Sequence, residues 1–329
     1  MVPGKQLTGG TGELLDTLTA VGVGDDVSPA PTAPPAPTAV IGREREVELL
    51  LAALDAGAHV VLEGPPGTGK STLLRVVAQA ESIGFRFVEG NAELTPTRLV
   101  GHFDPARVLS DGYSPDVFVD GPLVDALRNG SLLYVEELNR VPEETLNVLL
   151  TVMSEGELHV PRLGVVRAAT GFRLIAAMNP FDAVGTARIS SAVYDRTCRI
   201  VMGYQAAEVE TAIVAAQVAA PPPAWLRKVV DVVRSSRAHD DVAVGSSVRG
   251  AIDLAGVAAA LAKRRGKDVT DWHVGLDAAL VALTGRIRLH DSAAHTAEDV
   301  VRGLWIAVFG AEPSPDSANS EGSADSGEA

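Results

Sequence analysis

The segment GPPGTGKS at residues 64–71 constrains this chain more than any other. It follows the apolar run HVVLE at 59–63, which predicts a buried strand, and it precedes a helical pattern that runs from Ser71 to Ala80. Glycines in such a loop let backbone N–H groups point inward at phosphate oxygens, and the helix that follows adds the positive end of its dipole. The sequence therefore predicts a strand–loop–helix unit that binds the phosphates of a nucleotide.

The polar residues of this loop have distinct expected roles. Lys70 is expected to reach the β- and γ-phosphates, and Ser71 to place its hydroxyl on Mg²⁺. The candidate nucleotide-binding residues are Gly64, Pro65, Pro66, Gly67, Thr68, Gly69, Lys70, Ser71 and Thr72. The loop recognises phosphates and not the base, so ATP is the expected ligand while GTP stays open.

A second acidic element follows the apolar strand pattern at 132–135, where Glu136 and Glu137 stand side by side. In parallel sheets the ligand lies at the carboxyl ends of the strands, so both carboxylates are expected to face the phosphate loop. Glu136 is the candidate for holding the Mg²⁺ shell, partly through water, and Glu137 for polarising the attacking water. An alternative is that both are surface glutamates.

Strand and helix patterns alternate up to about residue 204, which predicts a parallel sheet with helices on both faces. Strands are expected at 59–63, 85–88, 132–135, 174–178 and 199–202, with helices at 44–54, 71–80, 123–128 and 143–153. From 205 the pattern is helical only, with segments at 206–219, 224–237, 247–264, 275–288 and 297–308. The predicted organisation is an α/β nucleotide-binding domain at 39–204 and an all-α lid domain at 205–310.

The composition predicts a tail on each side of these two domains. Residues 1–38 end in a Pro/Ala-rich stretch and residues 311–329 hold five acids and no base, so disorder is expected in both. The formal net charge of −14 and the lack of a dense basic stripe argue against nucleic acid as the main partner. A single cysteine, Cys198, fits a reducing cytosol and is expected to be a small buried hydrophobe. With no apolar run near the length of a membrane span and no signal pattern at the N-terminus, a cytoplasmic location is expected.

Taken together, these motifs resemble the AAA+ superfamily, and within it the MoxR-like group, which is related to the NorQ/CbbQ type and to gas-vesicle N proteins. The similar segments are Ile41-Gly42-Arg43-Glu44 and the runs at 59–73, 120–158, 172–180, 190–196 and 244–256. The resemblance covers about residues 39–308 and implies a P-loop NTPase fold, namely an AAA+ core followed by a helical lid.

The resemblance also implies roles for further residues. Ile41 and Gly42 would touch the adenine, and Asn179 matches the polar residue called sensor 1. Arg196 would act on the nucleotide of a neighbouring subunit, although Arg188 or Arg199 could take this role instead. Arg249, in the Gly-x-Ser-x-Arg motif of the lid, is the sensor 2 candidate, and Arg140 is a further candidate for a contact in trans. Each of these could also be an ordinary turn or surface residue.

By this resemblance, the chain is expected to be an ATPase that cleaves the β–γ phosphoanhydride with Mg²⁺ between the subunits of a ring, for which a hexamer is expected. The ring is expected to remodel or activate a protein client. Clients of the group often carry a von Willebrand factor A domain. One departure is Glu136, where the family usually has Asp; Mg²⁺ keeps several waters, so the longer side chain is tolerable. Glu136 also raises an alternative, a weakly hydrolysing scaffold such as a gas-vesicle assembly factor. A nucleic-acid motor is a third possibility.

Two segments are expected to be insertions. Residues 93–118 look irregular, and in this family an insert at this place lies near the ring pore. Residues 158–172, with Gly164 at the turn, predict a β-hairpin before the sensor strand.

Overall fold

The computed structural model describes residues 40–180, 191–218 and 221–313. Residues 1–38, almost all of 311–329, and Arg188 lie outside this range, so the two predicted tails and one finger candidate receive no structural account. The boundaries proposed at 39–204 and 205–310 stay predictions.

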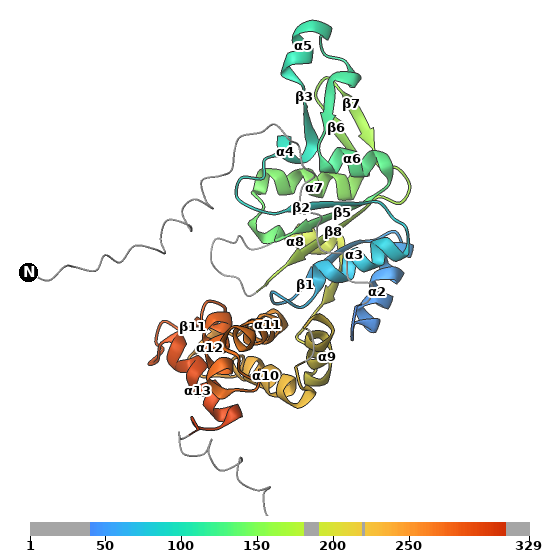
Figure 1. Cartoon of the computed structure of the whole chain (residues 1–329). Coiled ribbons are helices and arrows are strands. Elements are labelled where there is room, and N and C mark those ends of the chain that lie inside the picture. Colours follow the sequence, from blue (N-terminus) through green and yellow to red (C-terminus); the bar gives the residue numbers. More distant parts are fainter. Residues whose placement is uncertain (1–39, 181–190, 219–220, 314–329) are drawn as a thin grey trace, which may run out of the picture. The chain divides into compact units, whose positions relative to one another are not determined.

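A five-stranded parallel sheet in the order β2-β5-β8-β1-β9 forms the centre of the α/β part (Figure 1). Its strands are β1 His59–Glu63, β2 Phe85–Glu89, β5 Leu132–Glu136, β8 Arg173–Met178 and β9 Thr197–Val201. The predicted parallel sheet is confirmed, and its five strands follow one another along the chain in the predicted order. β9 begins two residues before the predicted start at Arg199, because it pairs with β1 from Thr197 onward.

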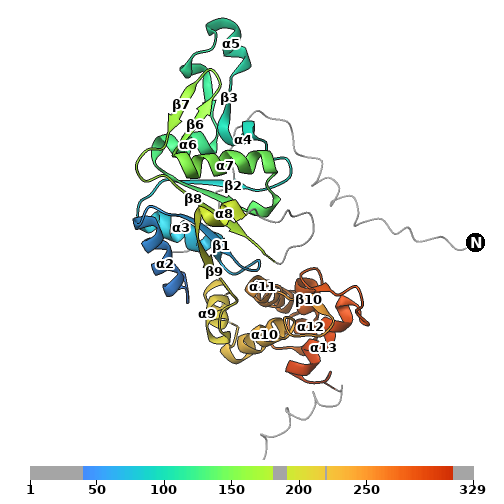
Figure 2. The ribbon, with the colours of Figure 1, turned by 180° about the vertical axis from the view of Figure 1, so that it is seen from behind.

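Side chains alternate between the two faces of this sheet, and each face packs on its own helices (Figures 1 and 2). Val60, Leu62 and Tyr134 pack with α2 Glu44–Asp55 and α3 Lys70–Ala80. Val61, Leu133 and Val135 pack on the opposite face, which is covered by α6 Pro122–Asn129, α7 Glu143–Glu155 and α8 Ser191–Asp195. A strand buried on both faces needs a continuous apolar run, which explains why the central strands lack a polar alternation.

The parallel register brings the carboxyl ends of the central strands to one edge. Glu63 at the end of β1 stands beside Met178 at the end of β8 and Val201 at the end of β9. The N–H of Gly64 donates to the carbonyl of Met178 at 3.2 Å, which places the start of the phosphate loop against Asn179. This edge is where the functional side chains gather.

The segment 93–118, predicted to be irregular, is instead built of short regular elements. They are α4 Pro96–Val100, β3 Gly101–Phe103, α5 Pro105–Asp111 and the 3-10 turn η1 Pro115–Val117, followed by β4 Phe118–Asp120, which pairs with β3. Pro96 and Pro105 stand at first-turn positions of their helices, where the missing N–H costs nothing. Each of these elements is only three to seven residues long, so the sequence contains no periodicity long enough to predict them.

The predicted hairpin at 158–172 is confirmed as β6 Glu157–Val160 and β7 Gly164–Arg167, paired antiparallel. Gly164 has a φ of +96°, a conformation that glycine adopts without steric cost. The guanidinium of Arg162 in the hairpin turn lies 3.8 Å from the ring centre of Tyr113, which follows α5. The hairpin and the insert therefore lie side by side (Figures 1 and 2).

The remaining described residues form a helical bundle with its own apolar core, in which Trp225 and Trp305 are buried. Its helices are α9 Ala207–Gln217, α10 Pro223–Ser235, α11 Val248–Arg265, α12 Trp272–Leu283 and α13 Ala297–Phe309. Two expectations are wrong here. The fourth helix lies at 272–283 and not at 275–288, and two strands, β10 Val242–Val244 and β11 Arg288–Leu289, pair antiparallel within the helical part. Both strands are too short for an alternation of side chains to be visible in the sequence.

Cys198 is exposed, which corrects its assignment as a buried hydrophobe. It lies on β9, an edge strand that is bonded to β1 on one side only. Among the helices within 40–180, 191–218 and 221–313, none has the length and apolar character needed to cross a membrane.

Candidate functional site

The phosphate loop leads from β1 into α3 with two glycines in left-handed conformations. Gly67 has a φ of +74° and Gly69, directly before α3, a φ of +87°. Lys70, the first residue of α3, is buried, and its Nζ donates to the carbonyls of Gly64 at 2.8 Å and Pro65 at 2.9 Å. Burial is the main cause that lowers the pKa of Lys70 to about 8; the charges of Arg249 and Arg43 act in the same direction, and those of Glu136 and Glu137 oppose it. The lysine charge is therefore held in a partly desolvated place, where an anionic ligand would stabilise it.

The metal-binding candidates meet directly. The Ser71 hydroxyl donates to Oε1 of Glu136 at 2.6 Å, although the two residues are 65 positions apart. The Ser71 Oγ also lies 3.2 Å from the hydroxyl of Tyr134, a buried side chain two residues before Glu136 on β5. A hydroxyl and a carboxylate side by side are oxygen ligands of the kind that Mg²⁺ takes in proteins.

Glu137 stands at a sharp turn of the backbone. It has a φ of +52° and a ψ of +46°, which is the left-handed region that few residues other than glycine occupy. Strain of this kind is found at functional sites, where the surrounding structure holds it in place. The next turn, η2 Leu138–Arg140, brings the Arg140 guanidinium back to the carboxylate of Glu137 at 2.6 Å.

These groups line one cavity of about 250 Å³. The lining residues are Pro66, Gly67, Thr68, Gly69, Lys70, Ser71, Thr72, Glu136, Glu137, Asn139, Arg140, Ala177, Met178, Asn179 and Arg249. The cavity thus brings together most of the loop, both glutamates, and the residues predicted as sensor 1 and sensor 2. Gly64 and Pro65 are not among its lining residues, and they contact Lys70 through their carbonyls.

Arg249 reaches this cavity from the helical part. It lies in the first turn of α11, just after Ser247. Ser247 approaches the phosphate loop so closely that a Cβ added to Gly67 would stand 2.1 Å from its Oγ. This contact places the start of α11 against the loop and aims Arg249 at the same cavity as Lys70.

Ile41 and Gly42 are not cavity-lining residues. The Gln205 side chain donates to the carbonyl of Ile41 at 2.8 Å, and Val209 of α9 packs against Gly42. The buried guanidinium of Arg43 then bonds the carbonyl of Thr68 in the phosphate loop at 3.0 Å and that of Gly203 at 2.6 Å. The segment expected to touch the base is thereby tied to the loop and to the start of the helical part.

Arg196 and Arg199 occupy different environments. Arg199 pairs with the buried carboxylate of Glu63 at 2.5 Å, and Tyr194 donates to the same carboxylate at 2.6 Å. Arg196 lies outside the cavity, with its Nε donating to Ser154 at 2.6 Å and its Nη1 to the carbonyl of Ala192 at 2.9 Å. Arg199 therefore already forms an ion pair within its own chain, with Glu63.

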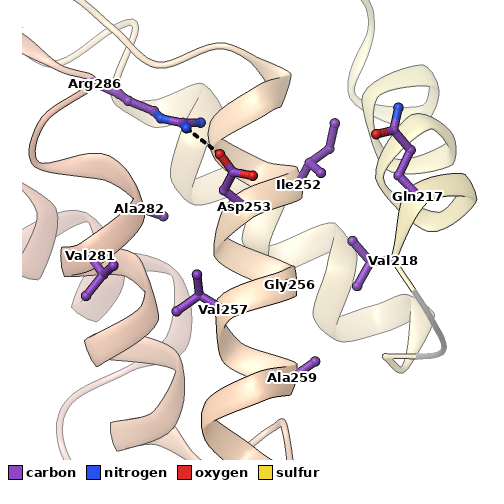
Figure 3. Close-up of a pocket in the computed structure, with 10 residues that line it drawn as sticks. All are labelled: Gln217, Val218, Ile252, Asp253, Gly256, Val257, Ala259, Val281, Ala282 and Arg286. Carbon is purple, nitrogen blue, oxygen red and sulfur yellow. Dashed lines mark hydrogen bonds and ion pairs between the residues drawn. The ribbon is translucent and has the colours of Figure 1, made fainter. Parts of the chain in front are cut away.

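A larger hollow of about 660 Å³ lies among α9, α11 and α12 (Figure 3). Its lining residues are mostly aliphatic or small, and its charged pair, Asp253 and Arg286, is neutralised internally by an ion pair. It contains no residue of the phosphate loop, so we assign the chemistry to the smaller cavity.

Residues 59–197 match the family model of the AAA domain, dynein-related subfamily. The fold is similar to that of the RuvB Holliday junction branch migration motor of Thermotoga maritima, with a TM-score of 0.51 at 17% identity, over 75% of this chain and 72% of that one. At this identity the likeness to RuvB shows a shared fold and no more.

Two uncharacterized proteins are similar to this chain in sequence. An uncharacterized protein of Staphylococcus epidermidis is 32% identical over 148 residues, which is 44% of this chain and 56% of the relative. Another, from Staphylococcus haemolyticus, is 29% identical over 202 residues, or 60% of this chain and 76% of the relative. The chain thus spans a little over half the length of the first of these relatives.

Two residues at the phosphate-loop cavity make contacts that the sequence did not predict. The contact of Tyr134 could have been predicted from the sequence. Its hydroxyl lies in an otherwise apolar strand two residues before Glu136, so both side chains are on the same face of the strand. The contacts of Arg43 could not have been predicted, because only the tertiary fold brings the carbonyls of Thr68 and Gly203 to its guanidinium.

Proposed function

We propose that this protein binds ATP with Mg²⁺ in the phosphate-loop cavity and hydrolyses it between the subunits of a ring, in order to remodel or activate a protein client. The observation that carries the proposal is the bond between Ser71 and Glu136 beside Lys70 and Glu137 in one cavity. The family match over 59–197 supports the ATPase part. The client and the ring rest on the resemblance to the MoxR-like group.

Each residue has a task in this proposal. Lys70 and the backbone N–H groups of the loop bind the phosphates, and Arg249 contacts them from the helical part. Glu137 orients and polarises the attacking water, which Asn179 also positions. Ile41 and Gly42 lie beside the base.

The residues present fit a magnesium ion. Ser71 and Glu136 supply a hydroxyl and a carboxylate at 2.6 Å from each other, next to the buried lysine. When bound, Mg²⁺ would neutralise part of the charge on the β- and γ-phosphates. Ser71 would hold it directly and Glu136 partly through water, which suits the longer glutamate because Mg²⁺ retains several waters.

The test of hydrolysis is Glu137→Gln. Nucleotide binding should persist, because the amide keeps the shape of the side chain, while steady phosphate release should fall by about 10²–10⁴-fold. Glu144→Gln is the matched control, since Glu144 is an exposed glutamate in the first turn of α7. Unchanged turnover in Glu137→Gln would refute the role of Glu137, and equal losses in both variants would show a nonspecific effect.

The ring is tested by mixing two inactive variants, Lys70→Ala and Arg196→Ala. If Arg196 acts on a neighbour's nucleotide, a Lys70→Ala subunit can still supply its arginine to the intact loop of an Arg196→Ala subunit. Random assembly from equal amounts should then recover roughly a quarter of the wild-type rate. No recovery would contradict action in trans, and Arg199 is the less suitable finger because Glu63 already holds it.

The client is proposed to be a protein, and the resemblance to the MoxR-like group favours one with a von Willebrand factor A domain. The insert at 93–118 and the hairpin β6–β7 are the proposed contact region, and they expose Leu109, Tyr113 and Val165. The net charge of −14 weighs against a nucleic-acid motor. Proximity labelling of a host protein by a probe at position 109 would test this contact.

One observation favours a second function. Glu136 in place of the usual Asp moves the carboxylate outward by one methylene, which would suit a scaffold that binds ATP and hydrolyses it slowly. Purified protein that binds ATP with Mg²⁺ but shows no steady phosphate release, alone or with a client, would favour the scaffold. Glu136→Asp should then raise turnover.

A further inference from the structure

A hydroxyl group lies in the middle of an apolar strand next to the metal-binding candidates. Tyr134 has no exposed surface and stands between Leu133 and Val135 on β5. Its hydroxyl oxygen is 3.2 Å from Ser71 Oγ, and Ser71 bonds Glu136 at 2.6 Å. Because side chains two apart on a strand share a face, Tyr134 and Glu136 both point toward Ser71 at the start of α3.

The direction of these hydrogen bonds follows from the number of protons. A serine hydroxyl has one hydrogen, and Ser71 donates it to Oε1 of Glu136. The bond between Tyr134 and Ser71 must then be donated by the tyrosine. A tyrosine hydroxyl carries its proton at neutral pH, so Tyr134 has a hydrogen to donate. The result is a directed chain from Tyr134 through Ser71 to Glu136.

This hydrogen-bond arrangement leaves one lone pair of the Ser71 hydroxyl oxygen unused. A hydroxyl oxygen accepts at two lone pairs, and Tyr134 occupies one of them. The second lone pair is available toward the cavity that Ser71 and Glu136 line.

The position of the tyrosine ring is set by packing. Its centroid lies 5.9 Å from the ring of Phe85 and 5.7 Å from that of Phe87, both on the neighbouring strand β2. Arg75 of α3 places its guanidinium over both phenylalanine rings, at 6.0 and 5.8 Å. The tyrosine hydroxyl therefore has little freedom to leave Ser71.

We propose that Tyr134 is a positioning residue for the cation of this site: its hydroxyl orients Ser71 and, through Ser71, the Glu136 carboxylate, so that one serine lone pair faces Mg²⁺. This inference rests on the proposed binding of ATP with Mg²⁺. It also accounts for a glutamate at 136, since the hydroxyl chain restrains a side chain that has one more rotatable bond than aspartate.

The experiment measures the affinity of a fluorescent ATP analogue for the full chain, with Mg²⁺ and with EDTA. In Tyr134→Phe, affinity in EDTA should stay within about twofold of wild type, and the gain in affinity on adding Mg²⁺ should fall about three- to tenfold, the range for one lost hydrogen bond. Tyr113→Phe is the matched control, because Tyr113 is exposed and lies in the insert. An unchanged Mg²⁺ gain in Tyr134→Phe would overturn the inference.

A double-mutant cycle separates positioning from simple packing. If Tyr134 acts through Ser71, then Tyr134→Phe should reduce the Mg²⁺ gain no further in a Ser71→Ala background. An equal loss in both backgrounds, or an equal loss with Mg²⁺ and with EDTA, would indicate a structural effect only and would overturn the inference. If wild type itself shows no Mg²⁺ gain, the proposed function fails, and the inference fails with it.

A measurement on the wild-type protein covers the case in which Tyr134→Phe does not fold. The chain has 4 tyrosines, so the ring-carbon NMR signals of ¹³Cζ-tyrosine can be assigned by replacing the others with phenylalanine. Adding Mg²⁺ to the nucleotide complex should move the Tyr134 signal and leave that of Tyr113 in place. A Tyr134 signal that does not move would overturn the inference.

Discussion

His59, the first residue of β1, is held neutral inside the fold, and this makes stability depend on pH. Its Nδ1 accepts the backbone N–H of Leu174 at 2.9 Å, and its ring packs edge-on against Phe172 at 6.0 Å. Burial, aided by the charge of Arg173, lowers the pKa of His59 from 6.5 to about 4, while a backbone hydrogen bond to Met153 opposes the shift.

The sign and size of the effect follow from this pKa. In the unfolded chain His59 takes up a proton near pH 6.5, whereas the folded chain resists protonation down to about pH 4. The folded state binds fewer protons in that window, so its stability is complete above pH 6.5 and is lost as the pH falls toward 4. The difference between the two pKa values corresponds to roughly 3 kcal/mol in the free energy of unfolding. Solvent screening of a half-buried ring reduces this contribution to about 2 kcal/mol.

The perturbation is His59→Gln, which retains an acceptor and a donor and removes the titration. The free energy of unfolding, measured by urea denaturation at about pH 7.5 and about pH 4.5, should fall by about 1.5 kcal/mol more in wild type than in the variant. His102→Gln, at an exposed histidine of β3, should keep the wild-type dependence. The reasoning is refuted if His59→Gln and wild type lose the same free energy between these pH values.

Three further substitutions test other parts of the structure. Gly64→Ala would place a Cβ 2.0 Å from the backbone oxygen of Met202, so it should destabilise the fold by about 1–3 kcal/mol in urea denaturation; an unchanged free energy of unfolding would contradict this close approach. Glu63→Gln should cost about 1–2 kcal/mol, because the buried carboxylate pairs with half-exposed Arg199, and at high salt a persisting difference would show that the hydrogen bonds matter more than the charge. Leu109→Ser should change stability by no more than about 0.5 kcal/mol, since Leu109 is 91% exposed; a larger loss in thermal unfolding would show that α5 packs on other residues.

Much of the fold was predictable because its signals are local. The strand at 59–63, the glycine loop and the helix after it follow each other within 22 residues, and their chemistry requires those residue types in that order. The apolar run at 132–135 predicted a buried strand with Glu136 at its end for the same reason. Long helices such as α11 were visible through their periodicity.

Other features could not be predicted from the sequence, because the elements are short or because the contacting residues are far apart along the chain. β11 has two residues, so its pairing with β10 leaves no pattern, and α12 was placed three residues too late at its start. Cys198 resembles a core residue by type, and only the edge position of β9 exposes it.

The sequence by itself therefore determined that this chain has a phosphate-binding loop between a buried strand and a helix, and that an acidic pair follows another buried strand. Only the tertiary structure decided which of these groups meet. The parallel register sets the carboxyl ends of β1, β5 and β8 at one edge, so Ser71 touches Glu136 and Tyr134 across more than 60 positions of the chain. Residue type and spacing specify local conformation, whereas strand order and register specify contacts between distant segments, and these contacts place the site.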